Sequence, residues 1–372
     1  MKKKHNGVVS IWKFIFALPI LLHHFYAIND VTGEKHQLFI CGAIAVDFFF
    51  IVSGCLLAKK VASEERRQDD RPLYLATKDF MFGKIKGFYP YLLFSFLIFL
   101  GISLILHNRT PRELLGGFVD LTLLQMAGLP NLGFVGGAWF LSSMIIGMLV
   151  IYPLAKKYKK NFSWVIAPLI VIFVGGYMIK TAPSLRDAKA WIVFTTVGNA
   201  KAIFELAAGC IVYEISEWLK TISFTKIGKF TLSLIGTLSF AFVISVNLLK
   251  NDVRSFDWLF IMCLMVGVAI AFSEQTLFFN LADNRLFFFL EKVSAPLFLN
   301  NFVFIKITNE FAPFCQMAWA DKCKLVFVGA ILLSVVELYI IDGIQAVWRK
   351  IKKPVKGIFI VDKTIYNSDD SG

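Results

Sequence analysis

Ten long apolar runs, separated by short polar segments, constrain this chain more than any other feature of its sequence. A helix needs about 20 mostly apolar residues to cross a bilayer, and runs of that order recur along the whole chain. The ten candidate spans are 8–28, 38–58, 87–106, 133–155, 162–179, 198–218, 230–249, 258–274, 294–309 and 325–347. Within a bilayer the backbone must satisfy its own hydrogen bonds, which favours helices for runs of this length. We therefore predict an all-α polytopic membrane protein with about ten transmembrane helices.

The composition indicates that lipid, rather than water, surrounds most of the chain. Of the 372 residues, 57% are hydrophobic and 17% are charged, whereas soluble domains have about 45–50% apolar and about 25% charged residues. The longest polar segment, 59–78, is too short to fold alone as a soluble catalytic domain. We expect a single integral membrane domain over residues 1–350 and a cytoplasmic tail, 351–372, that is partly disordered.

The distribution of basic residues predicts the topology. When the N-terminus is placed in the cytoplasm, the cytoplasmic segments carry more than twice as many Lys and Arg residues as the outer segments, as the positive-inside rule requires. Ten spans return the chain to the same side, so we predict that both termini are cytoplasmic. These loops account for the formal net charge of +13, and we expect no nucleic acid partner.

Two features fall outside the regular series of spans. The stretch 114–128 is short and contains two glycines and Asp120, which favours a re-entrant or interfacial segment. Cys315 and Cys323 share one predicted outer loop, and their spacing leaves open whether they form a disulfide. No cysteine belongs to a CxxC motif or a Cys/His cluster, so we expect no metal site.

The first apolar run carries two ionisable residues on one helical face. Lys13 and His24 are eleven residues, or about three turns, apart, which places them roughly 16 Å apart along the helix axis. This face would join a cation near the inner surface to an imidazole near the outer surface. The alternative is that Lys13 reaches the lipid headgroups and His24 is an interfacial histidine. His23 is adjacent but points in another direction.

The second apolar run contains a carboxylate well inside the predicted span. Asp47 needs a partner to stay charged there, and His24 and Lys13 on the neighbouring helix are the natural candidates. A carboxylate that orients a histidine is a recurring arrangement in acyl transfer. A structural ion pair is the alternative. Ser53 and Gly54 would let another helix backbone approach closely.

Two further pairs of ionisable residues allow a functional and a structural interpretation. Lys84 and Lys86 flank the cytoplasmic end of the third span, where they would bind the phosphates of a nucleotide donor or simply anchor the helix. Lys201 and Glu205 are four residues apart in the sixth span, a spacing that is also typical of an ordinary helix ion pair.

From about residue 8 to 347 the chain resembles the acyltransferase-3 family of integral membrane acyltransferases, which O-acetylate cell-surface sugars. In that family the first helix carries a basic residue, ten intervening residues and a histidine, and Lys13 and His24 match this pattern with lysine where arginine is usual. The most specific match is the run 45–54, AVDFFFIVSG, which is similar to the signature Val-Asp-x-Phe-Phe-x-x-Ser-Gly. Looser similarities are the basic segment 83–91, the Trp-Phe-Leu sequence at 139–141 with Tyr152-Pro153, and the helix at 204–209.

The chain departs from the family pattern at two places. Gly87 stands where an arginine usually precedes the proline of the third span. Asn301 stands where the ninth span usually carries a histidine, and the tyrosines of that pattern are lost. These departures put the role of that histidine in doubt and suggest a divergent acceptor.

The resemblance implies a membrane-bound acyltransferase of the bacterial inner membrane. The donor would be acyl-CoA, with acetyl-CoA the default, and the acceptor a hydroxyl of a cell-surface or exported polysaccharide. His24 would act as general base or transient acyl carrier and Asp47 would hold it. The remaining assignments are Lys13, Lys84 and Lys86 to the donor and Trp139, Lys201 and Glu205 to the acceptor. The alternatives are a polysaccharide or lipid-linked sugar transporter and a catalytically inactive envelope scaffold.

Overall fold

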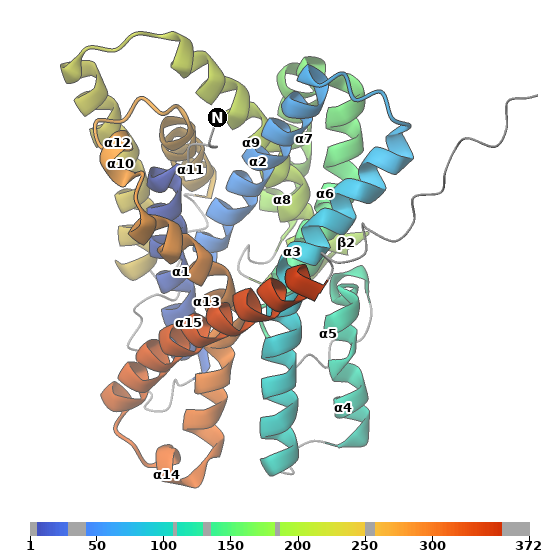
Figure 1. Cartoon of the computed structure of the whole chain (residues 1–372), viewed down its shortest axis with the longest axis vertical. Coiled ribbons are helices and arrows are strands. Elements are labelled where there is room, and N and C mark those ends of the chain that lie inside the picture. The colour runs from blue at the N-terminus through green and yellow to red at the C-terminus, as the bar shows by residue number, and fades with distance from the viewer. Residues whose placement is uncertain are drawn as a thin grey trace, which may run out of the picture.

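The computed structural model of the chain describes residues 6–28, 42–106, 110–128, 135–182, 187–249 and 257–351, and most of them are helical (Figure 1). Within these ranges the only strands are β1, Trp191–Ile192, and β2, Thr195–Thr196, which form an antiparallel pair. The prediction of an all-α polytopic membrane protein is therefore confirmed.

Each of the ten predicted spans coincides with a helix. Nine are single long helices: α1 Gly7–Ile28, α2 Ala45–Arg66, α3 Leu73–Leu106, α6 Ala138–Tyr158, α9 Val197–Thr221, α10 Lys226–Leu249, α11 Asp257–Phe272, α13 Arg285–Glu310 and α15 Trp319–Ile351. The span at 162–179 contains two π-helical stretches and comprises η3 Phe162–Ile166, α7 Ala167–Ile170, η4 Val171–Gly175 and α8 Gly176–Thr181. Eight of the ten are long and apolar enough to cross a membrane; α9 carries several charged residues, and α11 has only 16 residues.

The helices α3 and α15 extend beyond the spans that the sequence predicts. The prediction begins the third span at residue 87, but α3 begins at Leu73. Its additional turns carry charged side chains such as Lys78 and Asp79, so these turns do not belong to the apolar run of the sequence. A helix that leaves the bilayer continues in water, where such side chains are solvated, so the apolar run marks only part of the helix.

Short helices connect the long ones. The stretch 114–128 contains the end of one short helix and the whole of two others. It therefore contains no continuous helix long enough to span a membrane. The short helices are η1 Gly42–Ile44, α4 Pro111–Gly117, α5 Val119–Thr122, η2 Gln125–Ala127, α12 Phe279–Ala282 and α14 Ala312–Cys315. Cys315 and Cys323 are both free thiols in the structure, which answers the question that their spacing left open.

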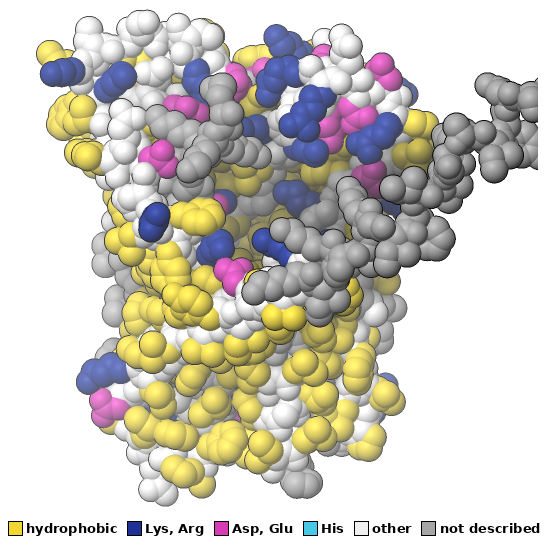
Figure 2. Space-filling view, viewed as in Figure 1, with side chains coloured by type: hydrophobic (Ala, Val, Ile, Leu, Met, Phe, Trp, Pro, Cys, Tyr) yellow, Lys and Arg dark blue, Asp and Glu magenta, His cyan; other side chains and the backbone are white. Residues whose placement is uncertain are grey.

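Apolar side chains cover the outer surface of the bundle. Figure 2 shows them dominating the lower half of one face, whereas Lys and Arg side chains gather at the upper end, near the connection between α2 and α3. Along α10, for example, Phe230 and Leu238 are each more than half exposed. A soluble protein would bury such side chains, and lipid is the solvent that favours their exposure.

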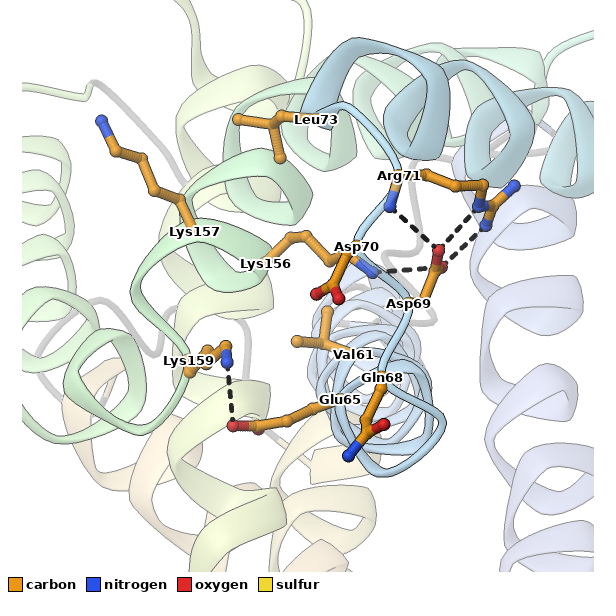
Figure 3. Close-up of a pocket in the computed structure, with 10 residues that line it drawn as sticks. All are labelled: Val61, Glu65, Gln68, Asp69, Asp70, Arg71, Leu73, Lys156, Lys157 and Lys159. Carbon is orange, nitrogen blue, oxygen red and sulfur yellow. Dashed lines mark hydrogen bonds and ion pairs between the residues drawn. The ribbon is translucent and has the colours of Figure 1, made fainter.

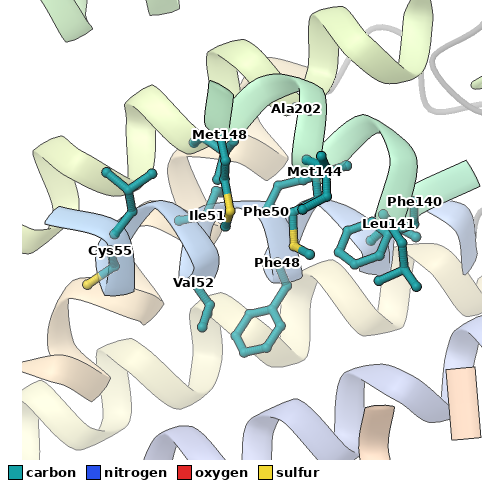
Figure 4. Close-up of a cluster of buried hydrophobic side chains, with 14 of the residues drawn as sticks. Phe48, Phe50, Ile51, Val52, Cys55, Phe140, Leu141, Met144, Met148 and Ala202 are labelled. Carbon is teal, nitrogen blue, oxygen red and sulfur yellow. The ribbon is translucent and has the colours of Figure 1, made fainter. Parts of the chain in front are cut away.

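Helices α2 and α9 approach each other closely. A Cβ atom added to Gly54 would overlap the backbone carbonyl of Leu206, and one added to Gly209 would overlap that of Ile51. This close approach is the one that Ser53 and Gly54 predict. On another side of α2, the methionine side chains of α6 reach toward Phe50 and Ile51 (Figure 4).

Ion pairs tie the connection between α2 and α3 to the end of α6. Asp69 accepts hydrogen bonds from the Arg71 guanidinium, at 2.7 Å from Nε, and from Lys156 Nζ at 3.2 Å (Figure 3). The hydrogen bond from Arg71 holds the pKa of the Asp69 carboxyl well below its usual range. Lys159 Nζ lies 3.3 Å from Glu65 Oε1. These basic residues are therefore largely paired with carboxylates of the same surface.

Candidate active site

Helices α1 and α13 run side by side in the same direction and bring the first site residues together. Near the start of each helix, Lys13 Nζ lies 2.5 Å from Glu291 Oε1. Near the end of each, the rings of His24 and Phe302 lie 4.3 Å apart. Eleven residues separate the two contacts on both helices, so the contacts are about 16 Å apart along the axes. Lys13 and His24 therefore share the face of α1 that packs against α13.

A cavity of about 270 Å³ opens beside Lys13, and we name it the Lys13 pocket. Helix α2 lines it with Phe49, Val52, Ser53 and Leu56, whose spacing places them on one helical face. The other lining residues are Phe88, Tyr91, Phe140, Leu141, Glu291, Ser294, Ala295, Phe298 and Leu299. Most of this wall is apolar, and the charged groups in it are Lys13 and Glu291. Figure 2 shows a hollow on the visible face of the bundle, with basic and acidic side chains around it.

Two ammonium groups lie at or near the Lys13 pocket. Glu291 accepts hydrogen bonds from Lys13 and, at 2.6 Å, from Ser10 Oγ. The ammonium of Lys84 lies close enough to that of Lys13 to repel it and sits 5.5 Å from the ring centroid of Phe80. The two ammonium groups offer positive charge to an anionic ligand. Lys86 is exposed and points to another side of α3.

A smaller cavity of about 140 Å³ adjoins His24, and we name it the His24 pocket. Its lining residues are Ile20, His23, His24, Ala43, Val46, Trp139, Asp187, Ala188, Lys189 and Phe298. The amide of Asn301 lies beside the imidazole. Neither Nδ1 of His24 nor the amide atoms of Asn301 have a hydrogen-bond partner within the described part of the chain. Unpartnered buried polar atoms at a pocket are available to a ligand.

Asp47 does not pair with His24 or Lys13, so the expected partners are wrong. Its carboxylate forms a buried ion pair with Lys201 of α9, and Glu205 lies in the same cluster. The physical reason is the rotation of α2. Asp47 lies four and seven residues before Ile51 and Gly54, which contact α9, so it lies on the face of α2 that packs against that helix.

The residues assigned to the acceptor separate into two places. Trp139 lines the His24 pocket, together with the histidines. Lys201 and Glu205 line neither of the two pockets, because both point from α9 toward α2 and join Asp47. The ammonium of Lys201 interacts with Asp47, Glu205 and Asp257. This cluster positions the helices, and α2 supplies side chains to both pockets from its other face.

Three residues at the site have no counterpart in the sequence interpretation. Glu291 lies before the ninth predicted span, which begins at residue 294, so the sequence does not identify it as a residue inside the membrane. Phe298 and Phe302 are two of 39 phenylalanines, and composition cannot distinguish them. Their spacing of four residues, on the helix that carries Asn301, is the only sequence signal that they share a face.

Within the described residues, no group of three or more His, Cys, Asp or Glu side chains could hold a metal ion. The ionisable groups beside the two cavities include an imidazole, ammonium groups and a carboxylate.

Comparison with known protein families gives one match. The model of a family described as "Acyltransferase domain" matches residues 8–337, which is nearly the whole chain. No curated protein and no solved structure matches the chain.

Proposed function

The chain belongs to the acyltransferase-3 family, and on that premise we propose that it transfers an acyl group, acetyl by default, from acyl-CoA to a hydroxyl of a cell-surface or exported polysaccharide. The observation that carries the proposal is the pair of pockets along α1. One is apolar and flanked by cations, and the other holds an imidazole with a buried, unpartnered nitrogen.

The Lys13 pocket takes the donor. Its apolar walls suit the pantetheine arm and the acyl group, and the ammonium groups of Lys13 and Lys84 pair with the phosphates of coenzyme A. Glu291 and Ser10 position the Lys13 side chain. Lys86 lies on a different side of α3 from Lys84, and it contributes positive charge to the surface without contacting the donor. The donor enters from the cytoplasm if both termini lie there, as the basic residues predict.

The His24 pocket takes the acceptor hydroxyl. The imidazole removes the hydroxyl proton as the oxygen attacks the thioester carbonyl, the carbon–sulfur bond breaks, and the imidazolium returns that proton to the thiolate of coenzyme A. The Asn301 amide, beside the imidazole, binds the acceptor, and Trp139 offers a flat apolar surface to a sugar ring. The Asp47–Lys201 pair keeps α2 in place between the two pockets.

A transporter of polysaccharide is less well supported. It would need a wide polar passage, whereas the Lys13 pocket and the His24 pocket measure about 270 and 140 Å³ and the Phe298 side chain belongs to both linings. The family is also one of acyltransferases. We place the enzyme in the bacterial inner membrane as a multi-pass protein, with acyl-CoA and a glycan as its partners.

The donor assignment is tested by ligand-induced thermal stabilisation of the purified protein. Coenzyme A and acetyl-CoA should both raise the melting temperature. Lys84→Ala should raise the apparent Kd of both roughly tenfold, because a charge-assisted contact with phosphate is lost. Lys86→Ala is the matched control, since it removes the same charge two residues away, and it should change the Kd little.

Two results would contradict the assignment. If neither ligand stabilises a folded preparation at saturating concentration, acyl-CoA is not the donor. If Lys86→Ala weakens binding as much as Lys84→Ala, the phosphates do not bind at the Lys13 pocket.

A further inference from the structure

Phe298 is the one residue common to the described linings of the Lys13 pocket and the His24 pocket. Its side chain is almost fully buried, and its ring packs edge-to-face against Phe140 at 5.2 Å between centroids. The imidazole of His24 belongs to one lining, and Lys13 to the other. A thioester in the Lys13 pocket would therefore be separated from the imidazole by the Phe298 ring.

The surroundings of Phe298 favour movement of its ring. Pro296, two residues earlier in α13, has no N–H group to donate to the carbonyl of Lys292, which weakens the helix at this point. The Phe298 ring also faces a glycine, because a Cβ atom on Gly137 would lie 2.9 Å from ring atom Cε1. Because Gly137 has no side chain, nothing at that position blocks rotation of the Phe298 ring.

We propose that Phe298 is a gate that separates the donor thioester from the acceptor pocket until transfer. The inference rests on the proposed function and goes beyond it, because it assigns to one side chain the control of access between the two substrates. With the ring in the position observed, the pockets are distinct. When the ring turns aside, the imidazole and the acceptor hydroxyl reach the thioester carbonyl.

The gate protects the thioester from water. If water entered the Lys13 pocket from the acceptor side, it would attack the carbonyl, the carbon–sulfur bond would break, and a carboxylic acid and the free thiol of coenzyme A would form. The proton lost by water would pass to the sulfur. Closing a site against this side reaction is a common task of mobile elements in transferases.

The test is the release of coenzyme A thiol from acetyl-CoA by the purified full-length protein with no acceptor present. Phe298→Ala should increase this hydrolysis several-fold over the wild type, because the partition is lost. Leu297→Ala is the matched control. It removes a fully buried apolar side chain from the preceding position of the same helix, and Leu297 lines neither pocket, so hydrolysis should stay near the wild-type rate.

The outcomes separate the gate from the proposed function. If acetyl-CoA stabilises Phe298→Ala but hydrolysis stays at the wild-type rate, or if Leu297→Ala raises hydrolysis equally, the gate is wrong. If acetyl-CoA fails to stabilise the wild type, the proposed function is wrong instead. Should Phe298→Ala fail to fold, Phe298→Leu decides in the same assay, since its smaller apolar side chain should give a smaller rise, and no rise overturns the gate.

Discussion

The imidazole of His24 lies in an unusual setting for a residue inside an apolar helix. It packs against the ring of Phe302, borders a cavity and keeps a buried nitrogen without a partner in the described part of the chain. Purely structural histidines tend to use such nitrogens in hydrogen bonds. The setting therefore favours a role in which the nitrogen accepts a proton from a ligand.

Replacing His24 by alanine should abolish most acyl transfer and leave folding intact. Loss of a general base lowers the rate by about 10²–10⁴-fold. The protein should still insert and fold, because the side chain borders a cavity and is not fully buried. Acylation of surface glycans, measured by mass spectrometry beside the amount of protein in the membrane, checks both expectations.

His23→Ala is the control for this variant. His23 also lines the His24 pocket, but its side chain points about 100° away around α1. Its loss should reduce transfer much less. Equal acylation in the two variants would refute the catalytic role of His24, even though the family assignment would stand.

At the scale of helices, the sequence predicts most of the fold but not the pairing of the site residues. Length and apolarity identify the spans, because a bilayer requires both. Neighbouring helices and their rotation depend on packing that no local pattern encodes. Asp47 illustrates the difference: its need for a partner is readable from the sequence, whereas the identity of that partner, Lys201, depends on which face of α2 meets α9.

The Lys13–His24 face is the part of the site that the sequence predicts best. Both residues lie on one helix, so a fixed rise per residue determines their separation. Glu291 and Phe298 come from α13, far along the chain, and only the folded structure brings them to α1 and the two pockets. The position of Phe298 between the two pockets could not be predicted, because α1, α2 and α13 together form those pockets.

The close contact between α2 and α9 predicts that two Gly→Ala variants differ in their melting temperatures. Gly54→Ala should lower the melting temperature strongly, because the added methyl group overlaps the Leu206 carbonyl and forces the helices apart. Gly87→Ala is the control on α3, where nothing lies within 4 Å of the added carbon. It should keep or raise stability, because alanine favours a helix by up to about 1 kcal/mol over glycine.

Thermal unfolding of both variants in the same detergent makes the comparison. A similar drop in melting temperature for Gly54→Ala and Gly87→Ala would mean that α2 and α9 do not approach as closely as the structure has them. The same variant tests whether position 87, where the family usually has an arginine, tolerates a side chain in this chain. A stable and active Gly87→Ala would show that it does.

At the scale of the whole molecule, the proposed function has one bundle span the distance between a donor on one side and an acceptor on the other. Basic side chains gather at the end that carries the α2–α3 connection (Figure 2), and the two pockets follow one another along α1. No separate soluble domain is needed, because the helices themselves form both pockets. The N-in and C-in topology remains the arrangement that the basic residues predict.

The most direct test of acyl transfer is mass spectrometry of the surface and exported glycans from two otherwise identical strains, one with this chain and one without. We expect an acyl ester, most simply acetyl, on glycan hydroxyls only in the strain that carries the chain, and its removal by mild base. The ester should return when the wild-type chain is restored. Glycans with the same acyl content in both strains, at equal sensitivity and with the protein present in the membrane, would contradict the account.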